Sequence, residues 1–193
     1  MSLAVLAPLR LEAWALGARR TGMGVRAADV RGYDAVAIGG LCGAVHPSLR
    51  PGDVVVASEL RDLEGLVVEC PYAASLVPLL RERGLRVAFG TIVSASRILG
   101  PAERARLDAL AVDMESVWLA HQAEPRPVAV IRAVVDRAGR RLLDPRTPFA
   151  GVRGLLSLRR AAPALAEWGA GLSAPPPEQA KRVVFPRPEE VSG

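Results

Sequence analysis

The chain has 193 residues, 50% of them hydrophobic and 23% charged, which is typical of one soluble α/β-sized domain with a single core. Its net charge of +5 would suit nucleic acid, but Lys181 is the only lysine and the arginines are scattered among 20 acids. With three Trp, two Tyr, three Phe and no recognition motif, no binding to DNA or RNA is expected, whereas a weak attraction to anionic membrane surfaces stays open.

The chain contains no run of about 18 apolar residues, which a membrane span requires. The N-terminus reaches Arg10 and Glu12 too early for a signal peptide, so a cytoplasmic location is expected. Cys42 and Cys70 are the only cysteines, and neither CxxC nor HExxH spacing occurs. We therefore expect free thiols, no metal site and no cofactor.

Short runs rich in Val, Ile and Ala alternate with helical patterns along the chain. The predicted strands are 3–7, 34–39, 53–58, 85–94 and 127–135. The predicted helices are 9–18, 24–31, 72–83, 101–121 and 148–171. This alternation predicts a mainly parallel sheet covered by helices, within one domain of residues 1–172. The Pro-rich remainder, 173–193, is expected to be an extended arm packed on the domain or on a neighbouring subunit.

Two glycine clusters follow apolar runs: TGMG at 21–24 and IGGLCGAVHP at 38–47. A dinucleotide fingerprint requires a helix directly after the glycines, but another strand pattern follows the second cluster, so NAD binding is not expected. No GxxxxGK[ST] loop occurs either. The glycines are interpreted as tight turns or as backbone that lies close to a flat ligand.

Four acidic residues stand out. Asp113 and Glu115 lie in the mostly apolar run AVDMESVWLA, about 200° apart on the predicted helix, so they cannot form a catalytic pair with each other. Asp113 is expected to cap a helix, whereas Glu115 is interpreted as a buried acceptor for a sugar diol. Glu12 and Asp136 follow predicted strands at one edge of the sheet. Arg132 shares a strand face with Asp136, either as a structural ion pair or as part of a site.

Five motifs occur in a characteristic order: LAPLRLEAW, TGMG, GGLCGAVHPSLRPGDVVVAS, AVDMES and VIRAVVD. Over about residues 3–140 they resemble the purine nucleoside phosphorylase and nucleosidase superfamily. The resemblance implies a single-domain three-layer fold with a central mixed, mostly parallel sheet flanked by helices, and a homo-oligomer, namely a dimer. The short gap between LEAWAL and TGMG, and the segment VRGLLSLRRAAPALAEW, look like the hopanoid-associated branch. That likeness implies removal of adenine from adenosylhopane.

The resemblance also implies roles for individual residues. Asp136 matches the general acid at the purine N7, Glu12 matches the base that activates water, and Arg132 matches a residue that orients that base or the water. Glu115 matches the residue that binds the ribose 2′ and 3′ hydroxyls, with Met114 packed under the sugar. Further substrate contacts are expected from Leu41, Cys42, Gly43 and Ile98.

Departures from the family pattern bear on the nucleophile and the substrate. Ile38 stands where phosphorolytic members have an arginine, and their GDPxR-type loop is missing, so water is favoured, although Arg10 keeps phosphorolysis open. Leu41 replaces a serine of the methylthioadenosine nucleosidases, and no phenylalanine stands at the stacking position near Ile98. The alternatives are a methylthioadenosine or adenosylhomocysteine nucleosidase, a phosphate-dependent phosphorylase, and a nucleoside-binding protein without catalysis.

Residues 149–172 carry a leucine stripe together with Arg153, Arg159 and Arg160. Packing against the sheet is one explanation of this amphipathic pattern. The other is an apolar path for a lipid-like substrate beside an anionic membrane.

Overall fold

The computed structural model describes residues 1–24, 28–139 and 147–172. Its strands are β1 (Leu3–Ala7), β2 (Arg19–Arg20), β3 (Ala35–Ala44), β4 (Val54–Asp62), β5 (Val67–Glu69), β6 (Val87–Ser94), β7 (Ala111–Asp113) and β8 (Val128–Val134). Its helices are α1 (Arg10–Leu16), the 3-10 helix η1 (Pro71–Ser75), α2 (Leu76–Glu82), α3 (Pro101–Arg104), α4 (Ser116–Ala123) and α5 (Thr147–Gly171). All five predicted strands are confirmed, because each is a short buried run of the β-branched and small residues that pack well in a pleated sheet.

The strands within the described residues form one mixed sheet in the order β2-β1-β3-β7-β6-β4-β5, and β8 pairs with both β3 and β4. Most neighbours are parallel; β3 with β7, β4 with β5, and β4 with β8 are antiparallel. The predicted mixed, mostly parallel sheet is therefore confirmed. Since β3, β8, β4, β6 and β7 pair in a closed cycle, this part of the sheet curls into a ring.

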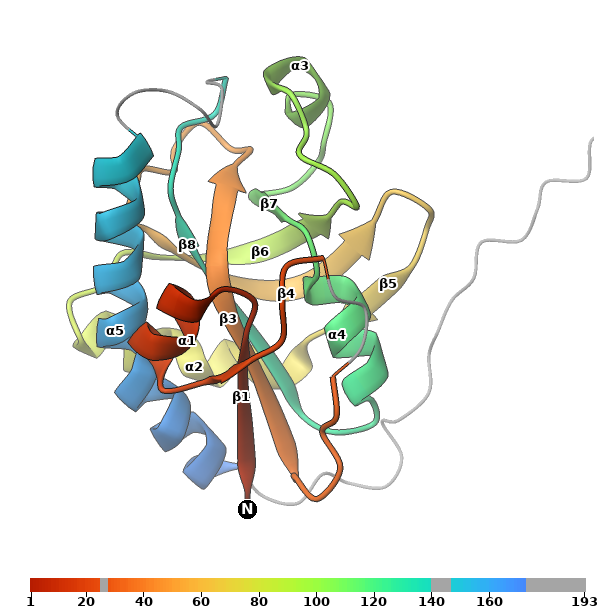
Figure 1. The fold of residues 1–193 in the computed structure, drawn as a ribbon, viewed down its shortest axis with the longest axis vertical. Helices are drawn as coiled ribbons and strands as arrows, with labels where there is room; N and C mark the ends of the chain where they lie inside the picture. The colour runs from red at the N-terminus through yellow and green to blue at the C-terminus, as the bar shows by residue number, and fades with distance from the viewer. Residues whose placement is uncertain (25–27, 140–146, 173–193) are drawn as a thin grey trace, which may run out of the picture.

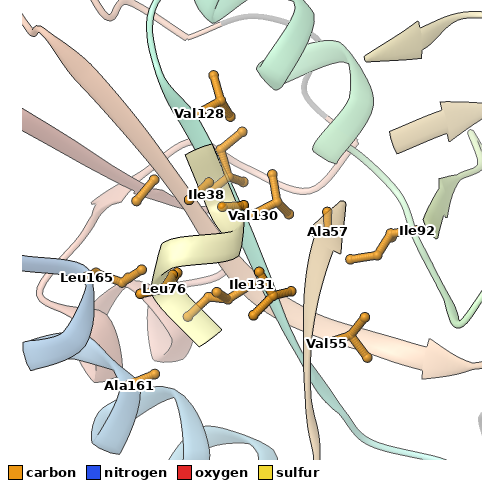
Figure 2. Packing of buried hydrophobic residues seen from close by; sticks show 14 of the residues in the cluster. Ile38, Val55, Ala57, Leu76, Ile92, Val128, Val130, Ile131, Ala161 and Leu165 are labelled. Atoms are coloured by element: carbon orange, nitrogen blue, oxygen red, sulfur yellow. The ribbon is translucent and has the colours of Figure 1, made fainter. Parts of the chain in front are cut away.

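Helices cover the sheet on both sides. Figure 1 shows α1, α2 and α5 on one side and α4 on the other, with β3 and β8 between them. Figure 2 shows how Ile38 of β3 and Ile131 of β8 pack with Leu76 of α2 and Leu165 of α5. The main apolar core includes β3, β8 and these helices, and a second, small cluster of Ala95, Leu99 and Val112 lies apart from it, so the core is not strictly single as predicted.

Helix α5 packs closely on the sheet. Leu158 and Leu165 are buried, which confirms sheet packing for that face, whereas Leu156 points outward and is 54% exposed. A methyl group on Gly154 would lie 2.8 Å from Leu41 Cδ2, so the glycine lets the helix backbone approach β3. The first turns of α5 therefore lie against the strand that carries the second glycine cluster.

Two predicted helices are wrong. The one over 101–121 is divided into α3, β7 and α4, because residues 111–113 pair with both β3 and β6 and this tertiary pairing overrides the local helical pattern. Asp113 therefore ends a strand and Glu115 immediately precedes a helix, so the argument from helical angles does not apply. In the predicted helix 24–31, the described residues 28–31 are not helical. The Ala28 N–H there donates to the Gln122 side chain.

Both cysteines are buried and unpaired. Burial raises the pKa of the Cys70 thiol to about 12 and raises that of Cys42 further still, so both are neutral near pH 7. None of the described helices is long and apolar enough to cross a bilayer. The predicted arm from Ser173 onward lies outside the described residues.

Candidate active site

A cavity of about 360 Å³ opens where α1, β3, β7 and the start of α4 meet. This volume is typical of a site for a small molecule. Its walls are formed by Pro8, Leu9, Glu12, Met23, Leu41, Cys42, Gly43, Arg97, Ile98, Leu99, Arg104, Val112, Asp113, Met114, Glu115, Val135 and Gly151. All the predicted substrate-binding residues line it, and so does Glu12. Arg132 and Asp136 lie behind the wall.

Glu115 is held at the cavity by Arg132. Its Oε1 lies 2.8 Å from Arg132 Nη2, and its Oε2 accepts a hydrogen bond of 3.4 Å from the backbone N–H of Gly24. Burial raises the pKa of Glu115, and the nearby Asp113 acts in the same direction, whereas Arg132 lowers it. Glu115 is thus a buried but partnered carboxylate that faces the cavity, which suits the binding of hydroxyl groups.

Asp113 fixes the start of α4. Its Oδ1 accepts a 2.5 Å hydrogen bond from Ser94 Oγ and weaker 3.3 Å bonds from the backbone N–H groups of Glu115 and Ser116. Its Oδ2 lies 2.7 Å from Arg132 Nε. Asp113 is therefore not the N-cap residue of α4, which is Glu115, but it has a structural role because its side chain accepts hydrogen bonds from the N–H groups at the start of that helix.

Arg132 is a central cation with no exposed surface. Its guanidinium contacts Asp113 and Glu115 and donates to Ser116 Oγ through Nε at 3.0 Å and Nη2 at 2.8 Å. Burial lowers the pKa of Arg132, but the carboxylates of Asp113, Glu115 and Glu12 outweigh this and raise it above its usual value. Arg132 therefore stays charged and holds the carboxylates in place.

The three glycines of the second cluster, Gly39, Gly40 and Gly43, lie within β3 and not in turns, so the tight-turn interpretation is wrong for them. A methyl group on Gly40 would lie 2.0 Å from Arg132 Nη1 and 3.3 Å from Glu12 Oε1. Gly40 thus leaves room for the guanidinium, and Nη1 has no hydrogen-bond partner among the described atoms. In TGMG, by contrast, Gly24 has a φ of 68°, as expected of a turn.

Glu12 joins α1 to β3. Its Oε2 accepts a 2.7 Å hydrogen bond from the Leu9 N–H at the start of α1, and its Oε1 accepts one of 2.8 Å from the Leu41 N–H. The side chain is almost fully buried, yet it lines the cavity. Each carboxylate oxygen can accept a second hydrogen bond, so Glu12 can also bind a water molecule.

Asp136 pairs with Arg104 and not with Arg132, so the interpretation of Arg132 and Asp136 as a structural ion pair is wrong. Strand β8 ends at Val134, so its side-chain alternation does not extend to Asp136. The Asp136 carboxylate accepts a 2.7 Å hydrogen bond from the Ala44 N–H and lies 2.6 Å from Arg104 Nη1.

Arg104 was not predicted as a site residue. It lines the cavity beside Gly43, where a methyl group would lie 2.7 Å from its Nη1 and 3.5 Å from Asp136 Oδ1. The sequence carries no local signal for it, because it is one of many arginines and its partner is 32 positions away. The Arg104–Asp136 pair lies directly behind Gly43 and presents a polar edge there.

The rest of the cavity is aliphatic, with Leu41, Ile98, Leu99 and Val112 in its walls and no aromatic side chain among the described lining residues. Arg10 is exposed on α1 and does not line the cavity. The described residues contain no cluster of three or more His, Cys, Asp or Glu that could hold a metal ion. The site thus combines an apolar slot with buried carboxylates and paired arginines.

Comparisons with known proteins agree with this architecture. The family model of the phosphorylase superfamily matches residues 7–152. The fold is similar to 5′-methylthioadenosine/S-adenosylhomocysteine nucleosidase from Helicobacter pylori, with a TM-score of 0.71 and 17% identity over 89% of this chain and 99% of that chain. Futalosine hydrolase of Helicobacter pylori is similar with a TM-score of 0.70 and 17% identity, over 89% of this chain and 98% of that chain. A putative 5′-methylthioadenosine/S-adenosylhomocysteine nucleosidase from Borrelia burgdorferi, bound to adenine, is similar with a TM-score of 0.74 and 14% identity, over 86% of this chain and 99% of that chain.

Proposed function

The chain belongs to the phosphorylase superfamily, and from that premise we propose that it hydrolyses the N-glycosidic bond of an adenine nucleoside with a modified ribose 5′ position. The observation that carries this proposal is the position of Glu12 and Glu115, two buried carboxylates that line one cavity. Bond cleavage passes through a ribosyl cation, so it needs a grip on the sugar, an activated nucleophile and a stabilised leaving base.

The ribose binds Glu115 through its 2′ and 3′ hydroxyls, and Met114 packs beneath it. The ionised carboxylate of Glu115 accepts a hydrogen bond from each hydroxyl, and Arg132 fixes its orientation from behind. Arg132 has no exposed surface, so it acts as a positioning residue that holds Glu115.

The nucleophile is a water molecule activated by Glu12. This carboxylate keeps its two backbone hydrogen bonds and takes the proton of water on a free lone pair as the bond to the anomeric carbon forms. Water is favoured over phosphate because the two arginines in the described cavity wall are already paired, Arg97 with Glu103 and Arg104 with Asp136. Arg10, which kept phosphorolysis open, is exposed away from the described cavity wall.

The leaving base binds at Gly43, with its N7 edge toward Arg104 and Asp136. Asp136 takes up a proton from solvent once Arg104 loosens its contact, and gives this proton to N7 as the glycosidic bond breaks, which prevents negative charge from building up on the purine. Arg104 adds positive charge at the same edge and has to loosen its contact with Asp136 when the carboxyl carries the proton. Ile98 and Leu99 cradle the faces of the base with aliphatic groups in place of an aromatic ring.

Adenosylhopane is the substrate that we propose within this class. Three exposed apolar side chains at the cavity wall support a bulky apolar 5′ group: Leu9, Met23 and Ile98. Leu41 further makes the wall apolar where a methylthioadenosine nucleosidase would have a serine. Such a nucleosidase remains the second candidate, because solved structures with this fold carry that name.

One assay tests the activity. The protein is incubated with adenosine, methylthioadenosine, adenosylhomocysteine and an adenosine with a long apolar 5′ chain, with and without phosphate, and released adenine is measured. We expect adenine and free sugar at the same rate without phosphate, and preference for the apolar 5′ chain. A strict phosphate requirement would show a phosphorylase, and no release with retained nucleoside binding would show a binding protein.

A further inference from the structure

An apolar surface extends across α1 and α5. Leu11 and Trp14 of α1 are 63% and 69% exposed, and Val152 and Leu156 of α5 are 56% and 54% exposed. We call these four residues the apolar face. The two helices pack against each other, as Figure 1 shows, and the Arg159 guanidinium lies 5.1 Å from the centre of the Trp14 ring. Large apolar side chains grouped in this way usually mark a binding surface.

Positive charge surrounds the apolar face. Arg10 on α1 and Arg153, Arg159 and Arg160 on α5 are all exposed. Among the described residues of these two helices, Glu12 is buried, and the only other acid, Glu167, is paired with Arg83 at 2.7 Å toward the far end of α5. The surface thus combines exposed Trp, Leu and Val side chains with arginines and has no unpaired exposed acid in its described part.

We propose that the apolar face docks on an anionic membrane surface. Trp and Leu favour the boundary between lipid headgroups and acyl chains, and arginines favour anionic headgroups, so one lipid surface satisfies both. A second copy of the chain fits less well, because a two-fold interface would bring the arginines of both copies together with no facing carboxylate.

The face also continues to the cavity. Leu9 and Gly151 line the cavity wall, and Leu11 and Val152 of the apolar face follow them closely in the chain. A docked protein would therefore hold the cavity beside the membrane. A substrate whose apolar part stays in the lipid could enter without crossing water. Docking itself does not depend on the proposed reaction, so it is tested without substrate.

The experiment is sedimentation of the full-length protein with vesicles of phosphatidylcholine, alone or with one third phosphatidylglycerol. We expect sedimentation with the anionic vesicles only, with loss at high salt. Since one arginine near an anionic surface changes partitioning about fivefold, Leu156→Ser with Arg160→Glu should weaken it about tenfold or more. The matched control is Leu63→Ser with Arg31→Glu, which removes an exposed leucine and an exposed arginine elsewhere and should bind as the unaltered protein does.

Tryptophan fluorescence gives a second readout. Anionic vesicles should shift the emission to shorter wavelength, and Trp14→Phe should abolish the shift while Trp118 and Trp168 remain. Binding that is equal on neutral vesicles, or a shift that survives Trp14→Phe, would overturn the proposal. So would a dimer in solution that Leu156→Ser dissociates, because a second copy would then cover the face.

Discussion

Arg104 Nη1 lies 2.6 Å from Asp136 Oδ2, and both side chains are almost fully buried behind Gly43. The pair therefore faces the place where the leaving base is proposed to bind. One partner can supply a proton and the other a fixed positive charge, and the two contributions are separable by substitution.

Arg104→Met should lower kcat by about 10²-fold, because a preorganised donor at a developing negative charge contributes roughly this much. Arg104→Lys should restore part of the loss. Asp136→Asn should also lower kcat by about 10²-fold or more while adenine still binds. Steady-state kinetics with adenine release check both, with thermal unfolding as the control for folding. Unchanged kcat in either folded variant would remove that residue from the mechanism.

The pH dependence should report Glu115. Because burial raises its pKa above the usual 4.5, the acid limb of kcat/KM should lie above pH 4.5, where the protonated side chain no longer accepts the ribose hydroxyls. The stability effect has the opposite sense. Because the pKa of Glu115 is higher in the folded than in the unfolded state, this group stabilises the fold at pH values below its unfolded-state pKa. The contribution is lost as the pH rises through its folded-state pKa.

Glu115→Gln tests both effects. The variant should lose the part of the acid limb that reports Glu115, and its free energy of unfolding should change less with pH across the same window. The pH dependence of kcat/KM measures the first effect, and urea denaturation at several pH values measures the second. An acid limb at or below pH 4.5 in the unaltered protein would contradict the proposed role.

Gly40→Ala should displace Arg132, because the added methyl group would lie 2.0 Å from Nη1. Glu115 and Glu12 would then lose their common neighbour, and we expect a fall in kcat/KM of about 10²-fold, typical of small misplacements of catalytic groups. Gly171→Ala is the matched control, because nothing lies within 4 Å of its added methyl group. Equal activity of the two variants would show that Arg132 tolerates the shift.

Arg132→Met should destabilise the fold by about 3–5 kcal/mol, since Asp113 and Glu115 would be left buried without their cation. Arg31→Met is the control. Its ion pair with Asp29 is exposed to solvent, so its removal should leave the free energy of unfolding almost unchanged. Chemical denaturation measures both. Similar costs for the two variants would mean that the buried cluster is no more important than a surface pair.

The sequence predicts well what depends on local pattern. Runs of buried small and β-branched residues predict strands such as β3, charge in apolar surroundings predicts Glu115, and the position after the first strand predicts Glu12. What it misses depends on distant partners. β7 has only three residues and forms because two other strands pair with it. Arg104 is recognised as a site residue only from its contact with Asp136 in the folded chain. Arg132 contacts Asp113 and Glu115 only when α4 is packed in its place.

The ring of strands has a consequence for how the protein folds. β3, which ends at residue 44, must meet β7 and β8, which begin at residues 111 and 128, before the ring can close. Pairings between segments so far apart in the chain make folding slow, because the entropy of closing the intervening loops is lost before the contacts form. Partly folded chains would hold Glu12 and Arg132 on strands and helices not yet joined. Ligand binding during refolding should therefore appear in a single late step, together with the last strand pairing.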